Sequence, residues 1–420
     1  MSGAAEPGLP CAGICRLILP VILPLSDAPN PRGVPIVNYT LIAINVAIYL
    51  FITWPMSRQA VDRGDPDLRA YMMTIRESLP PGMPLEVAVR SVSAYDLVVF
   101  RHGFRPAAPQ LLDLLTSVFL HGGFMHLFGN MLFLWIYGDN VEHRLGPMRY
   151  ALWYLLTGVA ATLFYTLFAP GSKLPLVGAS GAISGVLGFY FLWFPRNTVR
   201  LFVFLFPFFM NTVQIPARIV LGFYLLIDNL LPFVVTAGRA AGGVAHGAHI
   251  GGFVAGLAAA WLISRREVQK TPRAYRSSAT AASDKPSTSL AEAMRSGLFP
   301  EAARAYFALG PDQTRRLLSP SDSLALGNWL ERSNQTEAAL VVYRRHLRDY
   351  PGGPGAAEAH LRAGLIQLEV FGQPVPAYQH FLDALESNPS PEVAERARAA
   401  LQTIAGLQKY PLRGFTRPAT

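Results

Sequence analysis

The chain has 420 residues, of which 51% are hydrophobic and 15% are charged, and its formal net charge is +9. Soluble domains contain roughly 25% charged residues, so this composition argues against a wholly soluble protein and indicates a membrane protein. The positive charge does not indicate a nucleic-acid partner, because the arginines lie beside apolar runs, where the positive-inside rule explains them. The apolar runs fall in the first part of the chain and the remainder reads as soluble, so we expect two parts.

The first segment, 1–33, is predicted to be cytoplasmic. Cys11 and Cys15 lie close together there, at a spacing that fits no metal site, and a disulfide framework would need more cysteines than these two. The apolar stretch 17–25 contains two prolines and is too short to cross a bilayer. We interpret it as an interfacial segment or as the result of an overlong predicted start.

Six apolar stretches are long enough to cross a bilayer, which takes about 20 residues per helix. In chain order they are 34–54, 114–137, 150–169, 176–194, 216–235 and 244–263. A shorter apolar run, 201–210, contains Pro207 and is expected to lie as a loop at the membrane interface. The predicted fold class is therefore all-α: a polytopic membrane bundle of six transmembrane helices at 34–265, followed by a soluble domain.

The short connections between these stretches differ in charge. Basic residues gather after the second, fourth and sixth stretches: Arg144, Arg149, Arg196, Arg200, Arg218, Arg265, Arg266, Lys270, Arg273 and Arg276. The opposite side has only Lys173 and Arg239 in its short connections. The positive-inside rule then places both termini in the cytoplasm. We expect a multi-pass protein of the cell (inner) membrane.

The C-terminal part begins with a linker, 266–289, that is rich in Ser, Ala and Thr toward its end. Beyond it, Tyr306, Tyr343 and Tyr378 recur at intervals of 37 and 35 residues on predicted helical faces. This spacing is close to the period of about 34 residues in helix–turn–helix repeats. The segment 290–410 therefore resembles tetratricopeptide repeats, without their full consensus, and 411–420 is a tail. Such a stack offers a concave groove for a protein partner.

Ser180 lies in Gly178-Ala179-Ser180-Gly181, at the head of the fourth apolar stretch. A serine in a membrane helix usually hydrogen-bonds to its own helix. Nucleophilic catalysis requires more: a base within hydrogen-bond reach and donors for the oxyanion. The backbone N–H groups at a helix start lack intrahelical partners and can supply such donors. Gly178 and Gly181 leave open space around the hydroxyl.

His249 lies near the start of the sixth stretch, on the same predicted side of the membrane as Ser180. Gly252 and Gly256 follow it, and this small-xxx-small spacing allows close helix packing. Two tightly packed helices would bring Ser180 and His249 together at equal depth. An ionisable residue in a membrane span is rare and indicates function.

The second stretch contains His121, His126 and Asn130. The last two are spaced i, i+4 and share one helical face, where they could donate hydrogen bonds to an oxyanion. A polar pair that joins two helices is the structural alternative, and this pair alone does not decide between the two.

Together these motifs resemble the rhomboid family of intramembrane serine proteases. The matching elements are His121-xxxx-His126-xxx-Asn130, Gly178-Ala179-Ser180-Gly181, Ala248-His249-xx-Gly252-xxx-Gly256 and Glu142-His143-Arg144. The resemblance implies that Ser180 is the nucleophile and His249 the general base, without a required carboxylate. It further implies an oxyanion hole of His126, Asn130 and the Ser180 N–H. His121, Glu142 and Arg144 would be structural.

The resemblance also implies transmembrane protein substrates cleaved in the lipid bilayer, with no cofactor or metal. Three features depart from the family pattern. The Trp-Arg pair of many members is missing before His121. Ser184 stands where some members place a tyrosine against the catalytic histidine, so that ring packing is expected to be absent. His246 is an extra histidine, either a loop-side polar residue or a modulating base.

Other classes fit the sequence less well. A metal site of His121, His126, His246 and His249 would lack a carboxylate at ligand spacing. A rhomboid-like protein that binds or escorts membrane clients without cutting them is the main alternative to a protease. Such proteins lack the serine or the histidine, and this chain retains both. We therefore expect a serine endopeptidase.

Overall fold

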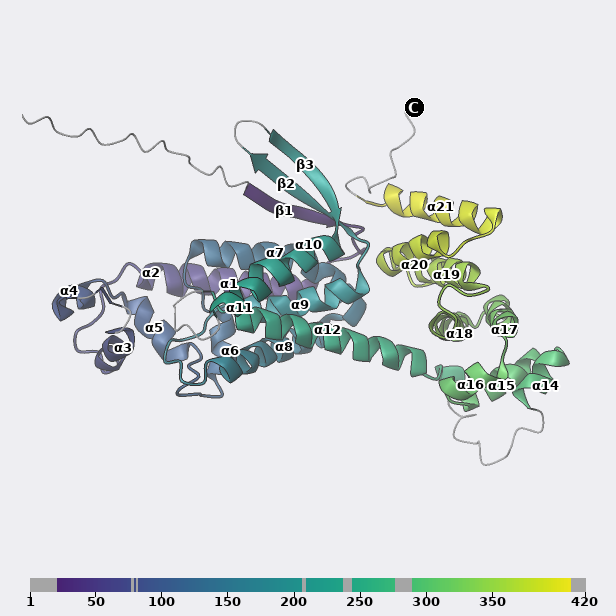
Figure 1. The fold of residues 1–420 in the computed structure, drawn as a ribbon, viewed down its shortest axis with the longest axis horizontal. Helices are drawn as coiled ribbons and strands as arrows, with labels where there is room; N and C mark the ends of the chain where they lie inside the picture. The colour runs from purple at the N-terminus through teal and green to yellow at the C-terminus, as the bar shows by residue number, and fades with distance from the viewer. Residues whose placement is uncertain are drawn as a thin grey trace, which may run out of the picture.

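The computed structural model describes residues 21–76, 79–80, 82–205, 209–236, 244–275 and 289–408. Several sequence-based expectations fall outside these residues: the cysteine pair Cys11 and Cys15, Pro207, Arg239, most of the linker, and the tail. Figure 1 shows a helical bundle, a small sheet beside it and a stack of C-terminal helices beyond one end.

The predicted helical membrane bundle is confirmed. Four helical stretches are long and apolar enough to span a membrane by length and composition: Ile36–Met56, Pro147–Phe168, Ala217–Thr236 and His246–Gln269. A further pair, Asp113–Phe119 and Phe124–Leu145, passes the same test together but is bent by 95°. The count by these criteria is therefore four, or five with the bent pair, among the described residues.

The elements of the bundle follow in chain order. They are α1 (Ile36–Ile48), η1 (Tyr49–Thr53), α2 (Trp54–Met56), α3 (Leu68–Ile75), α4 (Leu85–Arg90), α5 (Ala94–His102), α6 (Asp113–Thr116), η3 (Ser117–Phe119), α7 (Phe124–Leu145), α8 (Pro147–Phe168), α9 (Ser180–Trp193), α10 (Ala217–Phe223), η4 (Tyr224–Leu230), α11 (Leu231–Thr236) and α12 (His246–Gln269). In Figure 1, α3, α4 and α5 lie at the end of the bundle away from the C-terminal helices.

Two predicted spans differ from the observed helices. The stretch 114–137 is not one helix, because the chain leaves the helix between Phe119 and Phe124 and turns sharply at two glycines. The stretch 176–194 is helical only from Ser180, which leaves α9 with 14 residues. Leu176 instead pairs with Phe104 in an isolated β-bridge. Apolar composition did not reveal the second break, because Leu176 and Val177 are themselves apolar, whereas Gly122 and Gly123 were a signal for the first.

Helix α9 lies in the centre of the bundle, and most of its residues are buried. Its closest neighbour is α12, where the backbones nearly touch: a Cβ on Gly252 would lie 2.0 Å from the Gly181 carbonyl oxygen. A Cβ on Gly256 would lie equally close to the carbonyl oxygen of Gly185. The small residues at these crossing points allow the close approach that holds helices together in a membrane.

The predicted interface loop at 201–210 is wrong. Strands β2 (Thr198–Leu205) and β3 (Phe209–Pro216) pair antiparallel, and β1 (Val21–Ala28) pairs antiparallel with β2. Part of the predicted N-terminal interfacial segment is therefore a strand. Asp27 at the end of β1 anchors the sheet to the bundle, because it accepts hydrogen bonds from Tyr190 and from Asn140 Nδ2.

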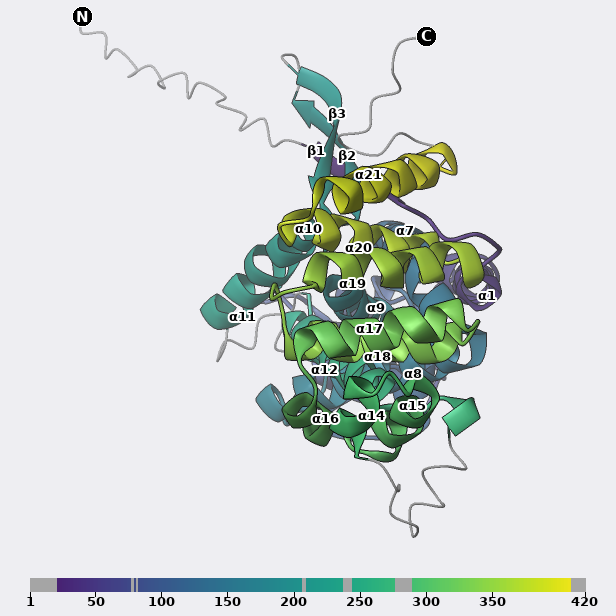
Figure 2. The same ribbon diagram turned by 90° about the vertical axis from the view of Figure 1, so that its right-hand side faces the viewer.

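The C-terminal helices stack in successive pairs (Figure 2). Their elements are η5 (Arg273–Tyr275), α14 (Leu290–Arg295), α15 (Phe299–Ala308), α16 (Pro311–Leu317), α17 (Pro320–Arg332), α18 (Thr336–Asp349), α19 (Ala356–Leu365), η6 (Ile366–Val370), α20 (Pro374–Glu386) and α21 (Pro391–Gly406). Tyr306, Tyr343 and Tyr378 are all buried in the cores of this stack. The tetratricopeptide resemblance itself stays a prediction.

The stack contacts the bundle at several places, of which two involve the ends of α9 and α12. Arg196, which follows α9, forms ion pairs with Asp383 and Glu386 on α20. Near the end of α12, the Val268 carbonyl accepts a 2.9 Å hydrogen bond from Arg345 Nε on α18. The helices that carry Ser180 and His249 thus both meet the C-terminal stack at their far ends.

Candidate active site

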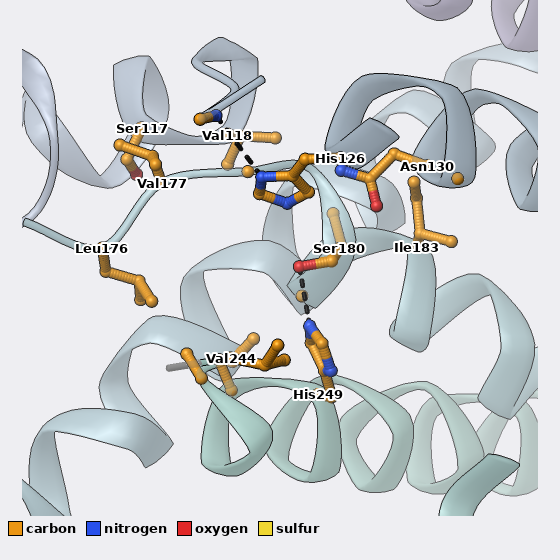
Figure 3. Close-up of a pocket in the computed structure, with 18 of the residues that line it drawn as sticks. Ser117, Val118, His126, Asn130, Leu176, Val177, Ser180, Ile183, Val244 and His249 are labelled. Atoms are coloured by element: carbon orange, nitrogen blue, oxygen red, sulfur yellow. Dashed lines mark hydrogen bonds between the residues drawn. The ribbon is translucent and has the colours of Figure 1, made fainter. Parts of the chain in front are cut away.

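A cavity of about 1010 Å³ lies among α7, α9 and α12. Its lining includes the predicted site residues His126, Asn130, Gly178, Ser180 and His249. Figure 3 shows His249 on one side of the Ser180 hydroxyl and His126 and Asn130 on the other. The sequence motifs from three separate helices therefore meet around one cavity.

Ser180 and His249 are in direct contact. His249 Nε2 lies 2.8 Å from Ser180 Oγ (Figure 3). Ser180 is the first residue of α9, and His249 is in the first turn of α12. Because the glycines of α9 and α12 let the two backbones approach so closely, side chains at the starts of these helices reach one another. The distance fits a nucleophile and its base.

Asn229 is a third member of this arrangement that the sequence analysis missed. Its Oδ1 lies 2.7 Å from Nδ1 of His249, and its Nδ2 donates a 2.8 Å hydrogen bond to the Tyr224 carbonyl. Since Oδ1 only accepts, Nδ1 of the imidazole must carry the proton, and Nε2 is then free to accept from Ser180. The polar pair Asp228 and Asn229 inside an apolar stretch was the signal available in the sequence.

The expected absence of a tyrosine ring beside His249 is wrong. Tyr224, from η4, stacks near the imidazole, with ring centroids 6.4 Å apart and planes inclined by 28°. Its hydroxyl lies 2.7 Å from Ser184 Oγ. The small residue at position 184 therefore accommodates a tyrosine that comes from another helix.

His126 and Asn130 present free donors to the cavity. His126 Nδ1 accepts a 3.4 Å hydrogen bond from the Gly122 N–H, which leaves the proton of a neutral imidazole on Nε2. The buried Nδ2 of Asn130 has no partner among the described residues. Gly178 has a φ of +121°, and a Cβ there would lie 2.7 Å from the His126 ring. Glycine at this position thus makes room for the imidazole.

The remaining predicted residues lie around this centre. His121 is buried, and its ring meets that of His126 edge-on, with centroids 5.2 Å apart. Glu142 accepts hydrogen bonds from the backbone N–H groups of Val37 and Asn38, so it caps the start of α1. Arg144 lies over the Trp193 ring and 3.6 Å from Glu267.

His246 is the first residue of α12, and its ring centroid lies 6.4 Å from that of His249. The hydrogen bonds that the His249 ring makes go to Ser180 and Asn229. His246 is therefore a neighbour of the pair rather than a link in its hydrogen-bonded chain.

Metal-type ligands come together elsewhere in the molecule. In the part of the chain that the structure describes, His360, His380 and Asp383 have ligand atoms within 4.8 Å of one another. They lie on α19 and α20, outside the cavity, and Asp383 is already paired with Arg196. The lining of the cavity, among the described residues, contains Ser180, His126 and His249 but no Asp, Glu or Cys.

Comparison with known proteins gives one family. The rhomboid domain matches residues 108–266. Rhomboid protein 1, mitochondrial, of Saccharomyces cerevisiae is 29% identical over 158 residues, which cover 37% of this chain and 42% of that protein. The rhomboid protease GluP of Bacillus subtilis is 38% identical over 106 residues, 25% of this chain and 20% of that protein.

Another relative, the inactive RHOMBOID-like protein 8 of Arabidopsis thaliana, is 35% identical over 79 residues, 19% of this chain and 22% of that protein. The matches to these three relatives thus span from a fifth to less than half of each relative's length. The matched domain contains Ser180, His249, Asn229, His126 and Asn130. Residues 108–266 of the chain thus match the rhomboid domain.

Proposed function

We propose that this protein is an intramembrane serine endopeptidase that cleaves transmembrane segments of other membrane proteins. The observation that carries the proposal is the 2.8 Å contact between Ser180 Oγ and His249 Nε2 beside a cavity of about 1010 Å³. The cavity lies in a helical membrane bundle, so a substrate that reaches Ser180 would approach it from the bilayer.

In the first step, Ser180 Oγ attacks the substrate carbonyl carbon while His249 Nε2 takes the hydroxyl proton. The carbonyl oxygen then becomes negative. Its charge is stabilised by the N–H of His126, the amide of Asn130 and the Ser180 backbone N–H, which lacks a helical acceptor. Both side-chain donors lie across Ser180 from the base (Figure 3), as the attack geometry requires.

In the second step, the C–N bond breaks, and the proton on Nε2 passes to the leaving amine. The acyl group remains on Ser180 Oγ until water attacks it, again with His249 as the base. Hydrolysis then releases the carboxylic acid and restores the hydroxyl. No step requires a cofactor or a metal.

The positive-inside pattern supports a cell (inner) membrane protein with both termini in the cytoplasm. The C-terminal stack would then lie in the cytoplasm and bind a protein partner or the clients themselves. Removing 285–420 should change client choice or rate but spare a generic substrate. Complete loss of generic cleavage in a well-folded truncation would contradict this role.

Cleavage of a reporter transmembrane substrate in liposomes tests the protease proposal. Wild type is compared with Ser180→Ala, His249→Ala and His246→Ala, each checked for folding by thermal melting. We expect Ser180→Ala and His249→Ala to be inactive and His246→Ala to retain activity. If wild type binds several permissive substrates and cuts none, the client-escort function replaces the protease.

A further inference from the structure

Asn229 forms part of a closed chain of contacts around the candidate active site. Ser180 contacts His249, His249 contacts Asn229, and Asn229 contacts the Tyr224 carbonyl. The Tyr224 hydroxyl contacts Ser184, which lies one helical turn after Ser180 on α9. Three helical segments, α9, η4 and α12, are thus joined by polar contacts around the imidazole.

The amide of Asn229 has a single orientation in this chain. If the amide were flipped, its NH₂ would face Nδ1 of His249 and its oxygen would face the Tyr224 carbonyl. The Tyr224 carbonyl would then lose its donor. The NH₂ could donate to Nδ1 only in the tautomer that carries its proton on Nε2, and Nε2 could then no longer accept from Ser180. The Asn229 side chain is only 2% exposed to solvent, so water cannot replace these partners. A buried polar group without partners costs roughly 1–3 kcal/mol. Asn229 therefore fixes the tautomer of His249 as well as the direction of its ring.

The local backbone places the amide there. Asn229 lies in η4, a π-helical stretch, and its side chain reaches back to a carbonyl five residues earlier. Such wide turns are frequent at functional sites. The span that contains η4, Ala217–Thr236, is also weakly packed against the rest of the bundle. In an 18-residue apolar segment of this span, 11% of the residues are buried, against 22% to 44% in the other three long spans. Polar contacts to His249 and Ser184 thus hold a span that apolar packing holds loosely.

We infer that Asn229 is a positioning residue that completes a Ser180–His249–Asn229 triad, with its third member on the loosely packed span Ala217–Thr236. This inference rests on the proposed protease function. An amide in this place supplies orientation and a fixed tautomer, as the third member of a hydrolase triad does, but adds no charge. The ability of His249 to act as a base then depends on the position of this span relative to α9 and α12.

The first test is kinetic and uses the full chain in liposomes. We expect Asn229→Ala to lower kcat by roughly 10-fold to 100-fold, with KM changed less than about twofold, because orienting a base acts on the chemical step. Asn229→Asp keeps an acceptor for Nδ1 and should recover most of this loss. It should also move the acid limb of the pH–rate profile to higher pH, because a carboxylate stabilises the protonated imidazole.

Asn45→Ala is the matched control, since Asn45 is a buried asparagine in another span and its amide donates only to the Leu41 carbonyl. It should leave kcat and the pH profile unchanged. An Asn229→Ala protein with wild-type kcat and pH profile would overturn the inference. So would equal losses in Asn229→Ala and Asn45→Ala, because both would then reflect general destabilisation.

A second measurement does not depend on cleavage. Imidazole ¹⁵N shifts of His249, assigned by comparison with His249→Ala, report which ring nitrogen carries the proton. We expect the Nδ1–H tautomer in wild type and its loss in Asn229→Ala. An inert wild type that shows this tautomer change would reject the proposed function while supporting the orienting contact. An Nε2–H tautomer in wild type would reject the orienting contact itself.

Discussion

Substituting alanine for Gly252 tests how far the catalytic geometry depends on the contact between α9 and α12. The added Cβ would lie 2.0 Å from the carbonyl oxygen of Gly181, 3.0 Å from the carbonyl carbon and 3.3 Å from Ser184 Cβ. Non-bonded heavy atoms prefer roughly 3.5 Å. The obstructing atom is helix backbone, which cannot rotate away as a side chain could, so the two helices must separate by about 1 Å or more.

The cost to stability should be modest and the cost to activity large. Overpacking destabilises by about 1–3 kcal/mol, and alanine regains up to about 1 kcal/mol over glycine in a helix. The net loss is then about 0–2 kcal/mol. By contrast, a misplacement of about 1 Å can lower a rate by roughly 100-fold, and Ser180 and His249 stand on the two helices that must separate.

The assay measures kcat on a reporter substrate in liposomes, covalent labelling of Ser180 by a fluorophosphonate, and thermal unfolding in detergent. Gly222→Ala is the matched control, because Gly222 is helical and a Cβ there meets nothing within 4 Å. It should remain active and be equally or more stable. If Gly252→Ala cleaves and labels like wild type, the helix contact does not set the catalytic distance and the reasoning fails.

Three further predictions address other parts of the molecule. Gly178→Ala should lower kcat by roughly 10-fold to 100-fold, because the added Cβ would collide with the His126 ring and the backbone φ of +121° disfavours alanine. Gly171→Ala is the control in the same cleavage assay, because a Cβ at Gly171 meets no atom within 4 Å. Glu142→Ala should destabilise the protein by about 2–4 kcal/mol, since two backbone N–H groups at the start of α1 lose their acceptor; an unchanged melting temperature would contradict the capping role. Burial lowers the pKa of His360 to about 4, whereas in the unfolded chain it is about 6.5. Between these pH values the unfolded state binds more protons than the folded state, so α19 and α20 should lose stability as pH falls from about 6.5 to 4. Hydrogen exchange of the backbone amides in these helices should become faster over this range. His360→Asn should reduce the change of exchange rate with pH.

The predicted nucleophile, base and oxyanion residues lie around one cavity, but the sequence did not reveal all of the hydrogen bonds that they make. Ser180, His249, His126 and Asn130 each stand in a local motif, and the small-residue spacing of α9 and α12 indicated which helices meet. Asn229 stands in no such motif, and its partner His249 lies 20 residues away on another helix. Only the folded chain shows that the two side chains touch.

The three-stranded sheet was also missed from the sequence, because part of its pairing joins segments that are distant in the chain. Strand β2 pairs with β3, which follows it, and with β1, a strand from the start of the chain. The pairing with β1 cannot be read from the run 201–210 alone, which shows only an apolar segment with a proline. The break before α9 was missed because Leu176 and Val177 are as apolar as the helix that follows. Hydropathy describes the solvent that a segment prefers and not the backbone conformation that it adopts.

The shortness of α9 has a consequence for the depth of Ser180 in the membrane. Fourteen helical residues rise only about 21 Å, whereas the hydrocarbon core of a bilayer is about 30 Å thick. If the far end of α9 is level with one face of the membrane, Ser180 lies several ångströms below the other face. A cavity of about 1010 Å³ would hold on the order of 30 waters at liquid density. Under the proposed function, the short helix would set the depth of the scissile bond, and water in the cavity beside Ser180 would supply the hydrolysis at that depth.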